Sequence, residues 1–152
     1  MSAPVNAHRH RGVVTVEYAF ILILGLLPLL LITFTGMMIF TARQSLEMAA
    51  QEGARAAMRF ASLGDREATA CEVARSRMQW LIDFAGDSSA TSCEATALQG
   101  AECGLPDTLC MRVTTAYDYN ARPFLPGTRT LYRWTLEHPI SSTATAQLDL
   151  VN

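Results

Sequence analysis

A long apolar run near the N-terminus is the clearest pattern in this chain. Gly12 to Ala42 is 31 residues, of which only Glu17 is charged. Within this run, Ala19 to Phe40 gives 22 residues without a charge, and about 20 residues are enough to cross a bilayer as a helix. We therefore predict a single transmembrane helix at residues 13–42.

The alternative interpretation of this run is a cleaved secretory signal peptide. Such a peptide has an apolar region of about 7–15 residues, followed by a cleavage site with small residues. Here the run is longer, and Phe40-Thr41-Ala42 matches such a site poorly. The preceding residues include Arg9 and Arg11 and no acidic residue. The positive-inside rule therefore places the N-terminus in the cytoplasm and residues 43–152 on the exported side.

After the apolar run, small residues recur at helical spacing. Ala49, Gly53, Ala57 and Ala61 follow one another every four residues, so they form a small-residue stripe on one face of a continuing helix. Such a stripe allows another helix to approach closely. It packs either on this protein's own globular part or on a neighbouring subunit, and the sequence leaves both open.

A second helix is predicted from roughly Arg66 to Ala85. We expect Gly64 to end the first helix and Asp65 to cap the second. Gly86 is expected to end the second helix, and a polar loop containing Ser and Thr follows it. The apolar face of the second helix consists of Ala70, Ala74, Met78, Leu81 and Ala85.

From Cys110 onward the pattern changes to alternation, which is typical of strands. Three alternating runs occur, at Met111–Tyr119, Thr130–Leu136 and Ala144–Leu150. We therefore predict an α+β fold. In this fold a long N-terminal transmembrane helix continues into an exported domain, where a second helix packs on a three-stranded antiparallel sheet.

All four cysteines, Cys71, Cys93, Cys103 and Cys110, lie on the predicted exported side. An even number in a small domain of an oxidising compartment suggests two disulfides. Three pairings are possible. We favour Cys103 with Cys110, because a short loop containing Gly and Pro separates them, and this leaves Cys71 to pair with Cys93. A zinc site is the alternative, but CxxC spacing is absent and no histidine is near.

Charge and motifs argue against two other classes of function. Residues 41–152 carry ten arginines and 13 acidic residues, a balance of −3, so we expect no basic patch for nucleic acid. The sequence has no phosphate-binding loop and no HExxH motif. His138 has no cysteine or serine partner suggested by spacing. We therefore expect no catalytic residues, no metal and no cofactor, and no enzyme activity.

The charge inside the apolar run is the most informative position. A carboxylate at the bilayer centre costs on the order of 3 kcal/mol on insertion scales, and less near an interface. Glu17 follows Gly12 by five residues and precedes Tyr18. It is either a juxtamembrane residue solvated by headgroups in an ordinary signal anchor, or a charge that meets a partner.

Together with its neighbours, this start resembles the processing site of a type IV-like prepilin. A basic leader ends at Gly12, and four mostly apolar residues, Glu17, Tyr18 and the apolar span follow. The order of parts is similar to that of a TadE-like pseudopilin of the tight adherence (Flp pilus) system. The small-residue helix at 49–57 and the strand at 113–119, with the Pro-Phe-Leu-Pro after it, also match.

The resemblance implies a processing step and a location. A membrane aspartic prepilin peptidase would cleave after Gly12, removing residues 1–12 as a leader peptide and leaving Val13 as the new N-terminus. The mature protein would lie in the bacterial inner membrane as a single-pass protein, with residues 43–152 forming a periplasmic pilin-like domain, or it would enter a surface pilus.

The resemblance also implies a role and partners. Glu17, with Tyr18 beside it, would act in assembly by meeting a subunit's N-terminal amine. The partners would be the prepilin peptidase, other pilins or pseudopilins, and the pilus assembly platform. The chain is far longer than the major Flp pilin, which favours a minor subunit required for pilus biogenesis.

Two other classes of function stay open. One is an uncleaved single-span accessory protein whose exported domain binds an envelope partner. The other is a membrane-tethered enzyme. Cleavage after Gly12 separates the pilin from the accessory protein, and a pocket with convergent titratable groups would be needed for the enzyme.

Overall fold

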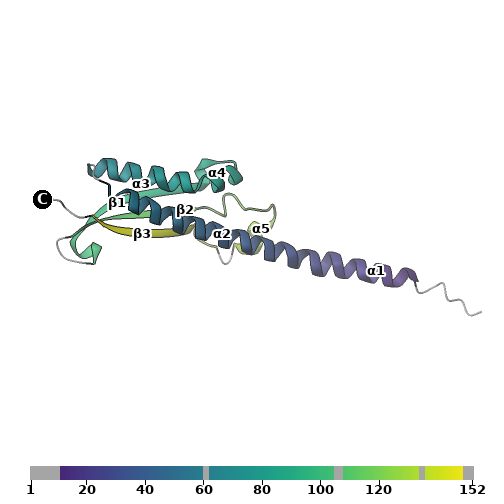
Figure 1. Cartoon of the computed structure of the whole chain (residues 1–152). Coiled ribbons are helices and arrows are strands. Elements are labelled where there is room, and N and C mark those ends of the chain that lie inside the picture. The colour runs from purple at the N-terminus through teal and green to yellow at the C-terminus, as the bar shows by residue number, and fades with distance from the viewer. Residues whose placement is uncertain (1–10, 60–61, 105–107, 134–135, 149–152) are drawn as a thin grey trace, which may run out of the picture. The chain divides into compact units, whose positions relative to one another are not determined.

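The computed structural model describes residues 11–59, 62–104, 108–133 and 136–148 (Figure 1). The chain divides into two compact units, Met1–Met37 and Met38–Asn152. The first contributes a long apolar helix and the second a mixed domain of helices and strands. The predicted α+β class is therefore confirmed.

The described part of the first unit is helical from its first residue. Helix α1 (Arg11–Ile21) passes through a single π-helical turn, η1 (Leu22–Leu26), into α2 (Leu27–Ala56), which also contributes to the second unit. At the end of the π turn, a backbone N–H donates to the carbonyl five residues earlier. Pro28 comes two residues after this turn; it has no N–H to donate, and a widened turn nearby accommodates this local loss of regular helical bonding.

Large apolar side chains of the first unit are exposed. Leu24 is 70% exposed and Phe20 is 59% exposed. The helix from Val14 to Ala56 is long and apolar enough to cross a membrane. Its part in the first unit, Val14–Met37, is about 36 Å long at 1.5 Å per residue, against about 30 Å for the hydrocarbon core of a bilayer. A helix that is apolar on all sides needs apolar surroundings.

The second unit is a layer of helices on one face of a three-stranded antiparallel sheet. Its strands are β1 (Thr91–Gln99), β2 (Leu109–Tyr117) and β3 (Ile140–Leu148). Their order is β1-β2-β3, with β2 in the centre. Figure 1 shows the three strands running side by side, with α3 along them. A three-stranded antiparallel sheet is what the sequence predicted, although one strand is not where we placed it.

Two of the predicted strands are present and the third lies elsewhere. The runs Met111–Tyr119 and Ala144–Leu150 correspond to β2 and β3, with residues 149 and 150 outside the described part. The prediction for Thr130–Leu136 is wrong, because its first residues belong to a short helix, α5 (Thr128–Tyr132). The remaining strand is β1, in the segment that was predicted as a polar loop.

The small size of its inward residues explains why β1 was missed. Cys93, Ala95 and Ala97 are the partly buried positions that pack against the core. Small side chains among serines and threonines give little contrast between the two faces, so the alternation is weak. The register makes the strand unambiguous, since Ala95 pairs with Val113 of β2, which pairs in turn with Ala144 of β3.

A glycine turn explains why the run from residue 130 is not a strand. Gly127 has a φ of 87°, a conformation that glycine adopts without steric cost. The next residue, Thr128, donates its hydroxyl to the carbonyl of Leu125 at 2.7 Å. The turn leads into α5, which brings the ring of Tyr132 to 6.2 Å from that of Tyr119, centroid to centroid.

The predicted second helix is present as two shorter ones. Helix α3 (Leu63–Arg77) and helix α4 (Gln79–Ala85) are interrupted at Met78, and Gly86 ends the second of them with a φ of 66°. The predicted apolar face is correct. Its four fully buried members are Ala70, Ala74, Met78 and Leu81.

The predicted caps between the first two helices are wrong. Helix α2 ends at Ala56, and Gly64 lies in the first turn of α3 instead of ending a helix. The N-cap is Ser62, whose hydroxyl oxygen accepts the backbone N–H of Asp65 at 3.3 Å. The same hydroxyl lies 2.6 Å from a carboxylate oxygen of Asp65. A serine with an acidic residue three positions later resembles a capping box, which outcompetes an aspartate cap further along.

The small-residue stripe packs on the protein's own domain. A Cβ atom at Gly53 would lie 2.7 Å from the carbonyl oxygen of Ala70 and 3.3 Å from a methyl carbon of Val113. The two alanines of the stripe that the structure describes are fully buried, and Ala61 lies outside the described residues. Of the two alternatives, the structure favours close packing of α2 against α3 and β2.

Two buried or half-buried polar contacts attach α2 to the rest of the domain. The hydroxyl of Thr115 on β2 donates to the backbone carbonyl of Leu46 at 2.9 Å. The indole N–H of Trp80 on α4 donates to the hydroxyl of Ser45 at 2.8 Å. Buried polar groups are costly unless they are paired, so these contacts fix how α2 lies on the sheet and on α4.

Candidate processing and assembly site

The predicted processing site lies at the beginning of helix α1. The backbone at Gly12 and Val13 is helical, because α1 starts at Arg11. Residues four positions apart lie on the same helical face, one turn from each other. Val13 and Glu17 are therefore neighbours along the helix, and a new N-terminus at Val13 would lie one turn from the carboxylate.

The predicted assembly residues are open to their surroundings. Glu17 is exposed, and Tyr18 is 63% exposed. Ion pairs in the described part of the chain include Arg43 with Glu47, Arg77 with Glu52 and Arg122 with Asp87, and these three do not involve Glu17. The carboxylate is thus accessible to a cationic group from outside the described part of the chain.

The two disulfides join the pairs that the sequence favoured. Cys71 on α3 is bonded to Cys93 on β1, and Cys103 is bonded to Cys110 on β2. The second bond joins the last residue of a short 3-10 helix, η3 (Gly100–Cys103), to β2. All four cysteines are used, so no free thiol remains. Both bonds are structural ties within the second unit.

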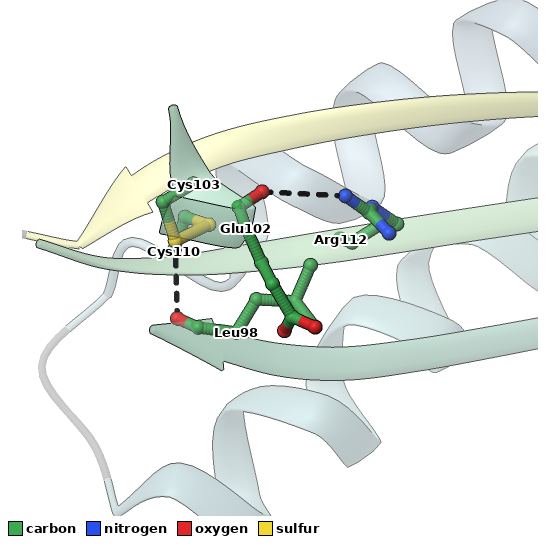
Figure 2. The surroundings of a disulfide bond; sticks show 5 residues. All are labelled: Leu98, Glu102, Cys103, Cys110 and Arg112. Atoms are coloured by element: carbon green, nitrogen blue, oxygen red, sulfur yellow. Dashed lines mark hydrogen bonds between the residues drawn. A yellow bond between two sulfur atoms is a disulfide. The ribbon is translucent and has the colours of Figure 1, made fainter. Parts of the chain in front are cut away.

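Figure 2 shows how the second disulfide secures the connection between β1 and β2. The sulfur of Cys103 lies 3.1 Å from the carbonyl oxygen of Leu98 at the end of β1. Because this sulfur is in a disulfide it carries no proton, so we interpret the approach as a packing contact. A guanidinium N–H of Arg112 donates to the carbonyl oxygen of Glu102 at 3.4 Å. The disulfide, the packing contact with Leu98 and the hydrogen bond from Arg112 therefore all hold η3 against the sheet.

The tyrosines of the predicted strand motif form a buried cluster. The hydroxyl of Tyr117 donates to the carbonyl of Arg122 at 2.6 Å, and the hydroxyl of Tyr119 lies 2.7 Å from that of Thr128. The ring of Phe124, from the Pro-Phe-Leu-Pro segment, stacks on Tyr117 with centroids 5.2 Å apart. Burial raises the pKa of Tyr117 to about 12 and raises that of Tyr119. Both phenols stay neutral at physiological pH and serve packing.

Two clefts of the domain are lined mainly by arginine and acidic side chains. One, of about 580 Å³, lies between α2 and α3 and includes Arg55 and the ion pair of Arg77 with Glu52, 2.6 Å apart. The other, of about 670 Å³, includes Arg129 and Glu137. Neither lining contains a cysteine or a histidine. Over the described residues, no group of three His, Cys, Asp or Glu side chains is placed to hold a metal ion.

Comparison with known families adds one finding. A family model described as TadE-like protein matches residues 12–55. The match begins at the glycine of the predicted processing site and runs through Glu17 and the first two residues of the small-residue stripe, Ala49 and Gly53, as far as Arg55. The resemblance to TadE-like proteins is thereby confirmed over this segment. No curated protein and no solved structure matches the chain significantly.

Proposed function

We propose that this protein is a minor pilin, or pseudopilin, required for assembling a tight-adherence (Flp-type) pilus, and that it matures by cleavage after Gly12. The match to TadE-like proteins at residues 12–55 supports this proposal. The observation that carries it is the position of Glu17, an exposed carboxylate one helical turn after Val13 at the head of an exposed apolar helix.

Cleavage would change the charge at this point of the chain. Water adds across the Gly12–Val13 peptide bond, which leaves a carboxylate on Gly12 and an ammonium group on Val13. The leader takes its arginines with it, and a new N-terminus, its own or that of a neighbouring subunit, then supplies a cationic partner for Glu17. In a low-dielectric setting such a pair fixes register, whereas an unpaired carboxylate is penalised.

The apolar helix and the disulfides support an inner-membrane protein with a periplasmic domain. The helical segment Val14–Met37 exposes large apolar side chains that suit lipid before assembly and the helices of neighbouring subunits afterwards. Both disulfides lie beyond Met38, and disulfides form in oxidising compartments such as the periplasm. The partners in this proposal are the prepilin peptidase, other pilins or pseudopilins, and the assembly platform, and the role requires no enzyme activity of the protein itself.

Replacing the carboxylate tests the assembly role. Glu17→Gln should still insert, because a neutral amide is cheaper in lipid than a carboxylate. It should also still be cleaved, because Gly12 is unchanged. Surface pili and adherence should fall, while the mature protein stays in the inner membrane at near-normal levels. Glu17→Asp should be intermediate, because it keeps the charge with one methylene less reach.

A matched control uses a second exposed glutamate on the same run of helix. Glu47→Gln removes an exposed carboxylate that is 3.7 Å from Arg43, a kind of surface pair that contributes little, and should leave pili unchanged. Pili are counted by electron microscopy in a strain without the wild-type copy. Normal pili with Glu17→Gln would show that this carboxylate is only a solvated juxtamembrane residue.

A further inference from the structure

Two contacts show in which direction β2 runs relative to α2. Val113 on β2 lies against Gly53, because a Cβ at Gly53 would be 3.3 Å from a methyl carbon of Val113. Further along β2, Thr115 donates its hydroxyl to the carbonyl of Leu46, which comes earlier in α2. The strand is therefore antiparallel to α2, and the chain beyond the end of β2 continues toward Met38, where the second unit begins.

One cleft of the domain lies at this end of the second unit. Its volume is about 670 Å³, within the range of about 300–1,000 Å³ that is typical of small-ligand sites. Tyr132 of α5 and Met38 of α2 pack against the same hydrophobic cluster, and Figure 1 shows α5 near the end of the domain at which α2 enters it. The cleft is lined by Asn120, Arg129, Thr130, Arg133 and Glu137.

This end of the domain is the one next to the predicted membrane. The spanning helix is predicted at residues 13–42, and the same helical run enters the second unit at Met38. A cleft at this end therefore lies near the lipid headgroups of the leaflet from which the domain emerges. This step rests on the membrane location in the proposed function.

The cleft is cationic. Arg129 and Arg133 are four positions apart, and Arg133 keeps helical backbone angles after the end of α5, so both side chains leave the same face. Both are exposed, and the ion pairs described above use other arginines. With two arginines and one glutamate, the lining carries a net charge of +1. Guanidinium groups bind phosphate oxygens in a bidentate way.

An unpaired hydrogen-bond acceptor belongs to the same lining. The side-chain N–H of Asn120 donates to the carbonyl of Leu136 at 2.6 Å, which identifies the other atom of the amide as the oxygen. That oxygen is buried and has no hydrogen-bond partner among the residues that the structure describes. A buried acceptor without a partner is costly, so a ligand that brings a hydroxyl group together with a phosphate suits this cleft.

We propose that this cleft binds the headgroup of an anionic phospholipid, a phosphodiester that carries free hydroxyl groups, such as phosphatidylglycerol. The two arginines hold the phosphate, and Asn120 and Glu137 accept the hydroxyl hydrogens. A headgroup with an ammonium also brings donors but is neutral as a whole, and a lining of net positive charge favours the anionic one. A lipid bound here would hold the domain against the membrane surface.

Native mass spectrometry of the full-length protein in detergent tests the site. From equal amounts of phosphatidylglycerol and phosphatidylcholine, which has no donor and no net charge, the protein should retain several-fold more phosphatidylglycerol. Arg129→Gln with Arg133→Gln should weaken this binding by about fivefold for each arginine. Soluble glycerol phosphate separates the two sources of phosphate and should bind much more weakly. Equal affinity for it and for the lipid would overturn the proposal.

Arg55→Gln with Arg59→Gln is the matched control. These arginines line the other cleft, beyond Gly53 and so toward the far end of α2, and their removal changes the net charge by the same amount. Retention of phosphatidylglycerol should not change. An equal loss from both pairs would indicate a general attraction between arginine and anionic lipid and would overturn the site. All four side chains are exposed, so the fold should persist, which thermal unfolding checks.

Extraction of membranes with alkaline carbonate separates this inference from the membrane location on which it rests. The wild-type protein should stay in the membrane and prefer phosphatidylglycerol. A protein that stays in the membrane but retains both lipids equally would contradict the lipid site alone. A protein that carbonate releases would contradict the spanning helix, and the lipid site with it.

Discussion

The two parts of the long helical run differ in which residues they expose and which they bury. From Val14 to Met37 the large side chains, such as Leu24 and Phe20, are exposed. From Met38 to Ala56 the fully buried residues are mostly alanines. Apolar character alone therefore does not mark a core. In this chain the size of the side chains distinguishes the part that packs within the domain from the part that needs other apolar surroundings.

The difference has a simple physical basis. Small residues let the backbones of α2 and α3 approach, which buries both and excludes water without long side chains. Large exposed apolar side chains have no such partner in their own unit. Contiguous exposed apolar surface marks a membrane or protein interaction site, so the first part is the one that needs an apolar covering from outside its own unit.

The largest expected effect comes from placing a large side chain at Gly53, where α2 packs closely against α3. Gly53→Leu forces a side chain into a space where a Cβ would already lie 2.7 Å from the carbonyl oxygen of Ala70. It should destabilise the domain by about 3 kcal/mol or more. Urea unfolding of the full-length protein in detergent, followed by tryptophan fluorescence, measures the loss.

Gly25→Leu is the matched control for that substitution. A Cβ at Gly25 has nothing within 4 Å, and the residue lies in the first unit. The stability of the domain should be unchanged. If the two leucine variants lowered stability equally, the distinction between the packed and the open part of the helical run would be wrong.

Removing the disulfides should have the next largest effect, and only on the domain. The Cys71–Cys93 bond spans 22 positions and the Cys103–Cys110 bond spans 7. The chain-entropy model gives about 3 kcal/mol for the first and about 2 kcal/mol for the second. Paired Cys→Ser variants, unfolded in urea, measure both. Membrane insertion should be unaffected, and a greater loss from the shorter loop would contradict the expected order.

The smallest expected effect is on how the stability of the domain depends on pH, and it comes from one surface carboxylate. Hydrogen bonds from Ser89, then the guanidinium of Arg122 3.0 Å away, lower the pKa of Asp87 from 3.8 to about 2. A carboxyl group with a lowered folded-state pKa stabilises the fold above its unfolded-state pKa, and this contribution is lost as the pH falls toward 2. Asp87→Asn should slightly lower the thermal midpoint at neutral pH and make no difference near pH 2. An equal change in the thermal midpoint at both pH values would rule out this link between the protonation of Asp87 and stability.

Much of the fold could be predicted because its signals are local. The apolar run, the apolar face of α3 and α4, and the alternation in β2 each follow from neighbouring residues. The strand β1 could not be found this way, because Cys93 and Ala95 give little contrast and the strand is defined by its pairing with β2. Likewise, the turn at Gly127 outweighs the alternation that follows it.

The processing and assembly roles of Gly12, Val13 and Glu17 stay predictions, whereas the cysteine pairing is confirmed by the two disulfides. Gly12, Glu17 and the cysteines stand out by spacing alone. The small-residue stripe could be assigned only when α3 was found against it, since two different surfaces would suit it equally well.

The most direct test of the proposed role is the intact mass of the protein extracted from membranes. Cells with an active prepilin peptidase should yield a chain that begins at Val13, and cells without the peptidase should yield one that keeps residues 1–12. Gly12→Leu should keep the leader in both. A protein that retains residues 1–12 in cells with an active peptidase would contradict the account and leave an uncleaved envelope protein as the better description.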